Sequence, residues 1–455
     1  DREWVNYAIN VAFSHVEPFL REALRLVLSI NPSVLGLSCT FQQTLPSIAL
    51  AKLVKKAAPD IHIMFGGAAM AGEMGRQWHK SHRCIDAVCL GEGEEVLPIY
   101  LLNRSRGDKT HFPGIIHRTK DGSIIDGGDA IPVRNMEAIP PPEYADHFAD
   151  LPATLYASTR LQFEGSRGCW WGQKHHCTFC GQNAEGLAFR QKSAEKVEKE
   201  ITSLSIKHNI RLVEFCDNIL SETHQKNLLP RLSQKWPPLG IFFEVKSNQT
   251  RDRVRALASA GVREVQPGIE SISTSQLKRM KKGVSGLQNI SMLKWCRLYG
   301  IIPYWNLLWG FPGETLDDYV LTHKFLPIIS HLQPPQACGT IRIDRFSPFY
   351  NDADNLGIQS LVPFAGYSQL LPDWSNEELW NISYHFEVSS YKRGMEPCDN
   401  RRVTEIAEIC DKWRANWSDK VNLSLVNEAG CWIVVDQRNL SFPKIIKISF
   451  EETRT

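Results

Sequence analysis

Short apolar runs that close on glycine or small polar residues alternate with helix-patterned segments over the first 105 residues. Residues 34–38 form one such run, residues 61–65 a second and residues 85–90 a third, and residues 47–58 place apolar side chains at helical spacing. A repeated order of strand, glycine turn and helix predicts a doubly wound parallel sheet. Ligands of such sheets bind beyond the carboxyl ends of the strands. The candidate binding residues there are Ser38, Gly66, Gly67, Gly91 and Gly93.

These glycines also have a plainer explanation, because each would serve equally well as a turn residue between strand and helix. The chain begins with Asp1 rather than Met. We therefore expect that preceding sequence, including the first strand of this sheet, is missing.

The middle of the chain repeats the alternation more regularly. A helix is expected over residues 193–207, capped by Ser193, and another over residues 251–260, ended by Gly261. Six βα units predict a partial (β/α)6 barrel, with its chemistry at the C-terminal ends of the strands. The expected strands are residues 161–164, 212–216, 241–245, 264–268, 305–309 and 340–345.

Turn and proline signals divide this α/β chain into four segments. Residues 113–134 are expected to form a hairpin, and the run Pro140-Pro141-Pro142 is typical of a stiff linker. A second hairpin is expected near the C-terminus, from residues 431–435 and 445–450. The predicted segments are a doubly wound domain at residues 1–135, a linker at 136–159, a barrel at 160–350 and a mixed C-terminal region at 351–455.

Composition narrows the class of protein. Of the 455 residues, 43% are hydrophobic and 22% charged, which predicts substantial folded cores. The 52 Lys and Arg against 50 Asp and Glu leave a net charge of +2, without the basic excess of a nucleic-acid binder, so a small or peptide ligand is favoured. No uncharged apolar run approaches the roughly 20 residues of a membrane-spanning helix, and no signal peptide is visible. A cytoplasmic protein with no membrane partner is expected, and its 12 cysteines are expected to be thiols or metal ligands.

Three cysteines stand close together, directly after the first expected barrel strand. Cys169, Cys177 and Cys180 would hold three irons of a 4Fe-4S cluster and leave the fourth iron open for chemistry. A zinc site completed by His175 or His176 is the competing interpretation, and three unliganded thiols are the plainest one. Their place at the mouth of a barrel favours the catalytic cluster.

The Cys-x7-Cys-x2-Cys spacing, with Phe179 before the last cysteine, resembles the radical S-adenosylmethionine (SAM) superfamily. The commonest motif of that superfamily has three residues between the first two cysteines, and this chain has seven. Cys-Trp-Trp-Gly at 169–172 and His-His-Cys-Thr-Phe-Cys-Gly at 175–181 resemble one subgroup, the radical SAM C-methyltransferases that mature ribosomally synthesised and post-translationally modified peptides (RiPPs). Further segments similar to that subgroup are residues 189–190, 243–246, 266–271, 280–283, 305–315 and 342–348, so the resemblance covers about residues 30–370.

The resemblance implies that Cys169, Cys177 and Cys180 are the iron ligands, that the open iron binds SAM, and that Phe179 and Gly181 lie near its adenine. It also implies SAM-binding roles at the ends of the second to fifth expected strands. Taken singly, each of these residues is also explained as a surface, salt-bridged or core residue. They are Asp217, Asn218, Glu244, Lys246, Gly268, Glu270, Ser271, Leu308 and Gly310.

The N-terminal domain resembles the cobalamin-binding domain that precedes many radical SAM methyltransferases. The chain has no Asp-x-His-x-x-Gly motif, so bound cobalamin would lack a protein histidine on its lower face, and a vestigial domain that binds nothing stays open. The leading hypothesis is an enzyme that C-methylates an unactivated carbon of a ribosomally made precursor peptide. Its cofactors would be SAM, a 4Fe-4S cluster and cobalamin, and its electron donor a flavodoxin or ferredoxin.

Two other hypotheses remain. One is a radical SAM enzyme that epimerises or cross-links a peptide and carries a vestigial cobalamin domain. The other is a zinc-stabilised binding protein without turnover. Cobalamin binding separates the first from the leading hypothesis, and iron content separates the second.

Overall fold

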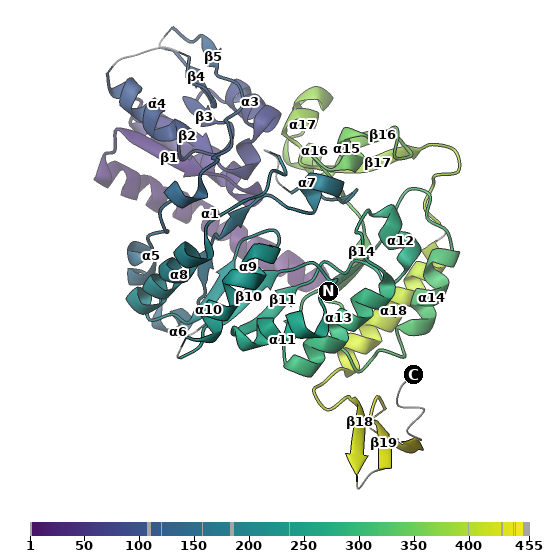
Figure 1. Cartoon of the computed structure of the whole chain (residues 1–455). Coiled ribbons are helices and arrows are strands. Elements are labelled where there is room, and N and C mark those ends of the chain that lie inside the picture. The colour runs from purple at the N-terminus through teal and green to yellow at the C-terminus, as the bar shows by residue number, and fades with distance from the viewer. Residues whose placement is uncertain are drawn as a thin grey trace. The chain divides into compact units, whose positions relative to one another are not determined.

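The computed structural model describes residues 2–106, 111–119, 121–156, 158–182, 186–235, 237–398, 400–428, 431–439, 441 and 443–448 (Figure 1). The chain forms two compact units. Unit 1 comprises Asp1–Arg134, Gln182–Gly186 and Val362–Glu387, and unit 2 comprises Asn135–Gly181, Leu187–Leu361 and Val388–Thr455. The four segments expected from the sequence stay a prediction, to which the structure adds that residues 362–387 group with the N-terminal residues.

Unit 1 is built on a five-stranded sheet in the order β1-β2-β3-β4-β5. The first three strands pair in parallel and the last two antiparallel, the latter being the hairpin expected at residues 113–134. Helices α1 (Arg2–Ile30), α2 (Thr44–Ala57), α3 (Gly72–Ser81) and α4 (Val96–Ser105) connect or precede them. The strands are β1 (Val34–Ser38), β2 (His62–Gly66), β3 (Ala87–Cys89), β4 (Ile115–Arg118) and β5 (Ile124–Asp126).

Strand β2 shows why this sheet is covered on both faces. Its side chains alternate between two cores, with Ile63 and Phe65 in the cluster that contains residues of α2 and α3. Met64 lies in a second cluster with Tyr100 of α4. Burial on both faces explains the continuous apolar run of β2. The expectation of a doubly wound parallel sheet is therefore confirmed for these strands.

The C-terminal part of unit 1 packs on helix α3. Leu379 and Ile382 of α17 (Asn376–Ile382) belong to the same core as Trp78 of α3, and the Asn381 side chain donates to the Gln77 side chain over 3.0 Å. Trp374 adds an aromatic contact to Trp78, with 5.2 Å between ring centroids. The short α16 (Gly366–Leu370) precedes this helix.

Unit 2 contains the parallel strands of the expected barrel. Five pair in the order β12-β11-β10-β9-β6, β13 pairs with β14, and a parallel bridge from Glu270 to Leu307 joins the two groups. The α/β expectation with parallel strands is confirmed. The strands are β6 (Leu161–Phe163), β9 (Leu212–Phe215), β10 (Gly240–Glu244), β11 (Val262–Gln266), β12 (Ile302–Pro303), β13 (Asn306–Trp309) and β14 (Ala337–Thr340).

Two expected strand boundaries were wrong. The fourth strand ends at Gln266 rather than at residue 268, because Gly268 has a φ of +53° that extended backbone does not adopt. The sixth strand covers Ala337–Thr340 rather than residues 340–345, and Ile343–Asp344 (β15) joins a different sheet.

Several helices of unit 2 begin at hydroxyl caps. The side chains of Ser193, Ser221, Thr250, Ser273 and Ser285 each accept from a backbone N–H three residues on. Expected helices 193–207 and 251–260 are found as α8 and α11. The helices of unit 2 are α5 (Ala145–Ala149), α6 (Ala153–Tyr156), α7 (Gly172–His175), α8 (Ala194–His208), α9 (Glu222–Asn227), α10 (Leu229–Ser233), α11 (Arg251–Ser259), α12 (Thr274–Arg279), α13 (Gly286–Tyr299), α14 (Asp317–Phe325), α15 (Pro348–Asn351) and α18 (Asn400–Asn416).

The last strands form two small sheets. One has the order β15-β17-β16, and the other is an antiparallel meander of three strands near the C-terminus. The hairpin expected there is confirmed by the pairing of Val435 with Ile445, although residues 449 and 450 lie outside the described residues. Besides β15, the strands of these two sheets are β16 (Ile358–Pro363), β17 (His385–Tyr391), β18 (Leu423–Glu428), β19 (Cys431–Asp436) and β20 (Lys444–Ile448). Strands β7 (Ser166–Arg167) and β8 (Arg190–Gln191) form a separate antiparallel pair.

Within the described part of the chain, no helix combines the length and apolar character that crossing a membrane requires.

Acid is expected to destabilise unit 1 through two buried histidines. Burial, helped by the charge of Arg104, lowers the pKa of His62 to about 4, and burial with Arg118 lowers that of His79 to about 4. Above pH 6.5 both imidazoles are neutral whether folded or unfolded, so stability is full. Between pH 6.5 and 4 only the unfolded chain takes up the protons, which costs up to about 2 kcal/mol per histidine at pH 5.

Hydrogen exchange of peptides from residues 62–90, corrected for intrinsic rates, measures this loss between pH 7 and pH 5. His79→Gln should remove part of it. His15→Gln, which changes an exposed histidine of α1, should leave it intact. Equal protection at both pH values in the wild type would contradict the prediction.

Candidate functional site

A buried carboxylate contacts the start of the loop that carries Cys169, Cys177 and Cys180, which is called the cysteine loop below. Asp217 follows β9 and is 1% exposed, and it accepts from the backbone N–H of Gly165 and from Ser166 Oγ, both over 2.7 Å. Burial raises the pKa of Asp217 to about 7, against the lowering effect of these donors. The Asp217 side chain therefore makes its contacts with the chain that leads from β6 to Cys169.

Backbone hydrogen bonds hold the cysteine loop on both sides. Thr178 N donates to Met280 O over 3.1 Å, and Thr178 O accepts from Phe349 N over 3.0 Å. Within the loop, Cys180 N donates to Cys177 O and Gly172 N approaches Cys169 Sγ at 3.3 Å. The loop is thus fastened to the segment after α12 and to helix α15 itself.

The three thiols of this loop are half-buried and lie beside two lysines. Burial raises the pKa of Cys177, while Lys282 and Lys246 oppose that rise and Cys169 adds to it. The positive charge of Lys282 also acts on Cys180. Three sulfurs close to two positively charged ammonium groups suit an iron–sulfur cluster, because the cluster with its thiolate ligands carries negative charge.

The two histidines of the loop are engaged elsewhere. The His175 ring lies on the Trp171 ring with 4.2 Å between centroids, and His176 Nε2 is 2.8 Å from Cys180 O. Within the residues that the structure describes, no group of three or more His, Cys, Asp or Glu side chains is arranged to hold a metal ion. The contacts of His175 and His176 do not favour the Cys3His zinc interpretation.

Lys282 lies close to Glu270, and its charge also acts on Glu244 at the end of β10. Glu270 Oε1 is 3.5 Å from Lys282 Nζ, and a Cβ on Gly268 would be 3.0 Å from the same ammonium. Burial, then Glu270, raises the pKa of Glu244 to about 7, with Lys282 opposing. Lys246 has its pKa lowered to about 8 by burial and by Lys282. These residues bring both signs of charge to the strand ends beside the cysteines.

Several other predicted site residues make hydrogen bonds within the chain. Ser271 Oγ accepts from Ser273 N over 3.0 Å, and Gly310 N donates to Glu314 over 3.0 Å. Leu308 N donates to Glu270 O over 2.9 Å, which holds Glu270 at its unusual φ of +57°. Asn218 is half-buried, Gly181 is buried, and the Phe179 ring lies 5.8 Å from Lys282 Nζ.

Lys282 is the site residue that sequence reasoning missed. It stands in the Met-Lys-Lys-Gly segment at residues 280–283, which the sequence had marked only as similar to a family segment. Position in the sequence does not tell which of two adjacent lysines points inward. The structure does, since Lys281 is exposed and Lys282 faces Glu270.

In unit 1 the predicted strand-end residues gather at one edge of the sheet. Cys39 N donates to Gly66 O over 2.7 Å, and a Cβ on Gly67 would lie 2.6 Å from Cys39 O, so glycine is required there by the neighbouring loop itself. Gly91 O accepts from Cys89 Sγ, and a Cβ on Gly93 would lie 3.8 Å from that sulfur. Ser38 is exposed at this edge. Small residues therefore line this edge of the sheet.

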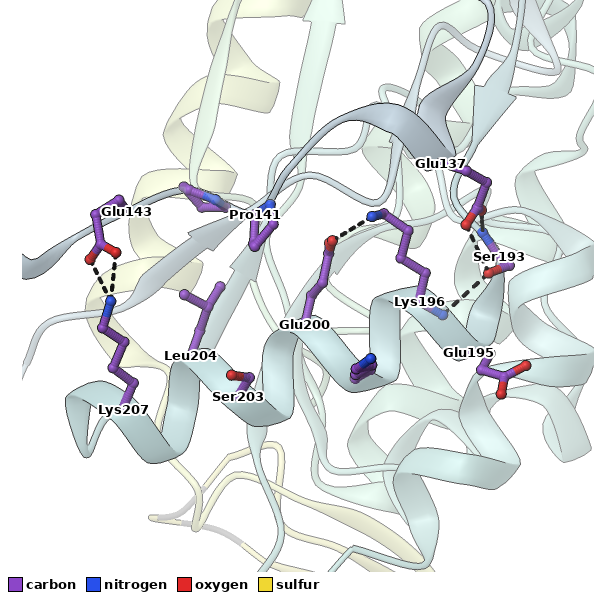
Figure 2. Close-up of a pocket in the computed structure, with 12 residues that line it drawn as sticks. Glu137, Pro141, Glu143, Ser193, Glu195, Lys196, Glu200, Ser203, Leu204 and Lys207 are labelled. Carbon is purple, nitrogen blue, oxygen red and sulfur yellow. Dashed lines mark hydrogen bonds and ion pairs between the residues drawn. The ribbon is translucent and has the colours of Figure 1, made fainter.

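A separate groove of about 690 Å³ lies along helix α8 (Figure 2). It is lined by linker residues and by charged side chains that pair with one another, such as Lys207 with Glu143 and Lys196 with Glu200. None of the predicted site residues lines it.

Comparison with known families places a recognisable domain over the barrel. Residues 163–326 match the model of the radical SAM superfamily. The match includes the three cysteines and the strand ends β9 to β13. It confirms the resemblance to the radical SAM superfamily and supports SAM and a 4Fe-4S cluster as cofactors.

Two curated relatives are methyltransferases by name. The chain is 26% identical over 310 residues to an uncharacterized methyltransferase of Pyrococcus horikoshii, covering 66% of this chain and 65% of that protein. It is 26% identical over 309 residues to the cobalamin-dependent radical SAM methyltransferase TokK of Streptomyces tokunonensis, covering 64% and 44%. The matched region thus spans less than two thirds of either relative.

Solved structures share the fold. The cobalamin-dependent SAM radical enzyme OxsB, with aqua-cobalamin and SAM bound, superposes with a TM-score of 0.65 at 17% identity over 87% of this chain and 60% of OxsB. The radical SAM methyltransferase TsrM from Kitasatospora setae, with cobalamin and a [4Fe-4S] cluster bound, gives a TM-score of 0.58 at 18% identity over 85% and 79%.

Removing the Asp217 carboxylate should destabilise the entry to the cysteine loop. In Asp217→Ala the Gly165 N–H and the Ser166 hydroxyl lose their buried acceptor, which costs about 1–3 kcal/mol per unpaired group. Urea unfolding of the full chain measures the loss. Asp217→Asn, which keeps one carbonyl acceptor, should lose less, and an Asp217→Ala protein as stable as the wild type would contradict the structural role.

Proposed function

We propose that this chain, which carries a radical SAM domain at residues 163–326, is a cobalamin-dependent radical SAM enzyme that methylates carbon. The observation that carries the proposal is the cysteine loop, whose three half-buried thiols lie beside Lys246 and Lys282 at the ends of parallel strands. The relatives that are methyltransferases by name support transfer of a methyl group.

Cys169, Cys177 and Cys180 would hold the cluster, and SAM would bind at the iron without a cysteine ligand. When bound, the cluster and SAM supply a radical that removes hydrogen from an unactivated carbon, and cobalamin supplies the methyl group. Such a carbon has no acidic proton, so general-base catalysis by a side chain cannot activate it.

The strand-end residues would bind and orient the polar parts of SAM. Glu244 and Glu270 accept hydrogen bonds from hydroxyl or ammonium groups, and Lys282 compensates their charge. Because the pKa of Glu244 is raised to about 7, a bound ammonium would favour its ionised form. Leu308 contributes through its backbone, which fixes Glu270, rather than through a polar contact.

Cobalamin would lie against the rim of unit 1 formed by Ser38, Gly66, Gly67, Gly91 and Gly93. Small residues there allow a macrocycle to approach the backbone. His62 begins β2, at the opposite end of the strands, so it is not placed to bind cobalt at this rim. The proposal is therefore cobalamin without a ligand from that histidine.

The substrate we propose is a ribosomally made precursor peptide. Support for a peptide comes from the motifs at residues 169–172 and 175–181, which resemble RiPP-maturation enzymes. A flavodoxin or ferredoxin would deliver the electron. Epimerisation or cross-linking of a peptide by the same radical is the alternative chemistry, and the methyltransferase relatives favour methylation over it.

Metal content tests the proposal first. The anaerobically reconstituted wild type should carry about four irons per chain and bind cobalamin, with a visible charge-transfer spectrum. Cys177→Ala should lose the cluster, whereas Cys216→Ala, which changes an exposed cysteine after β9, should keep it. Zinc in place of iron would contradict the proposal. Iron without cobalamin would favour the alternative, epimerisation or cross-linking of a peptide.

Isotope transfer tests the reaction. With SAM labelled in its methyl group by three deuteriums and a candidate precursor peptide, mass spectrometry should find the labelled methyl on a peptide carbon. Formation of deoxyadenosine with no methyl gain on the peptide would instead support epimerisation or cross-linking.

A further inference from the structure

The seven-residue spacer between Cys169 and Cys177 is anchored by a tryptophan. Trp171 Nε1 donates to Lys281 O over 3.1 Å. Its ring edge lies against Gly283, where a Cβ would stand only 2.1 Å from the ring. The indole of Trp171 therefore occupies space that glycine at position 283 leaves free.

Lys246 lies over this indole. Its Nζ is 3.4 Å from the centroid of the Trp171 ring, and it also donates a hydrogen bond to Lys282 O. An ammonium this close to a tryptophan face makes a strong cation–π contact, more so where water is excluded. The contacts of Lys246 are thus with the spacer and with the turn that carries Lys282, both parts of the protein.

The rest of the spacer depends on the same indole. His175, one turn further along α7, packs on the Trp171 ring. Trp170, on the other side, donates from Nε1 to Leu220 O over 3.3 Å. The two tryptophans therefore tie the spacer to two different loops of unit 2, the one after β9 and the one after α12.

The charge of Lys246 reaches the thiols at both ends of the spacer, Cys169 and Cys177, while that of Lys282 reaches Cys177 and Cys180. Both lysines thus act on Cys177. Only Lys246 is linked to the spacer through an aromatic ring.

We propose that Lys246 is a positioning residue for the iron–sulfur site rather than a ligand of SAM. Through its cation–π contact with Trp171 it fixes the spacer, and thereby the place of Cys169 relative to Cys177. The inference rests on the proposed function, because it takes these cysteines as the cluster ligands. It replaces the SAM-binding role that family resemblance implies for Lys246.

Limited proteolysis of the full chain without cluster tests, independently of activity, whether the contact of Lys246 with Trp171 fixes the spacer. This contact is called the clamp below. Lys174 is exposed in the middle of the spacer, and trypsin cleavage after it gives fragments of 174 and 281 residues, since 455 − 174 = 281. Lys246→Met should speed this cut about tenfold, because cleavage follows the open population and a cation–π contact is strong enough to change that population by about such a factor.

Three variants separate the contact from a general loss of structure. Lys246→Arg keeps the cation and should restore protection. Trp171→Leu should speed the cut as Lys246→Met does, and the double variant should be no faster than Trp171→Leu alone. Lys278→Met, which removes an exposed lysine of α12, is the matched control and should behave as the wild type.

The reconstituted protein supplies the second readout. The midpoint potential of the cluster, followed by electron paramagnetic resonance, should move to a more negative value in Lys246→Met and stay near the wild-type value in Lys246→Arg, because a nearby cation favours the reduced cluster. SAM affinity should be unchanged in both variants.

The outcomes distinguish the two proposals. A wild type that takes up no iron would end the proposed function. Suppose instead that the wild type has a normal cluster and that Lys246→Met shows the proteolysis rate and the cluster potential of the wild type. That result would overturn the clamp and leave the proposed function intact. Loss of SAM binding in Lys246→Met with the spacer still protected would also overturn the clamp, by showing that Lys246 is a SAM ligand.

Discussion

The position of the cysteine loop depends on the carboxylate of Asp217, which links two neighbouring strand ends. It takes one hydrogen bond from the backbone of Gly165 and one from the hydroxyl of Ser166, in a site closed to water. An unpaired donor in such a site is costly, so this geometry is strongly preferred. These two bonds join the backbone shortly before Cys169 to the residue that follows the end of β9.

Charge balance governs the rest of the site. Burial raises the pKa of Glu244, and Glu270 adds to the rise because the two carboxylates would repel one another if both were ionised. Lys282 offsets it and at the same time lies close to Cys177 and Cys180. One cation therefore serves both the carboxylates and the thiols, and a change at one set is felt by the other.

Much of the architecture follows from the sequence because periodicity and glycine placement report burial directly. The parallel strands of both units and the capped helices α8 and α11 were predicted close to their observed limits. The sixth barrel strand was misplaced because residues 340–345 read as one apolar alternation, whereas pairing with β13 stops at Thr340. Sequence pattern shows which residues are buried but not which partner strand ends first.

The packing of residues 362–387 on α3 was not predicted, for a different reason. Contacts such as Asn381 with Gln77 join residues about 300 positions apart, and no local pattern encodes such a pairing. The same holds for the site: the three cysteines were visible from spacing, but the inward direction of Lys282 and the position of Lys246 over Trp171 depend on tertiary structure. Residue types indicated the chemistry, and long-range packing determined which of them meet.

The long cysteine spacer makes these long-range contacts necessary. Seven residues between two ligands leave more backbone freedom than three, and each additional ordered residue costs about 1–2 kcal/mol of conformational entropy. A one-turn helix, α7, is too short to be stable alone. Tertiary anchors must supply the difference, and in this chain Trp170 and Trp171 provide them. In this chain Gly283 leaves room for the Trp171 ring and Lys246 lies over it, and both positions are far from the spacer in the sequence.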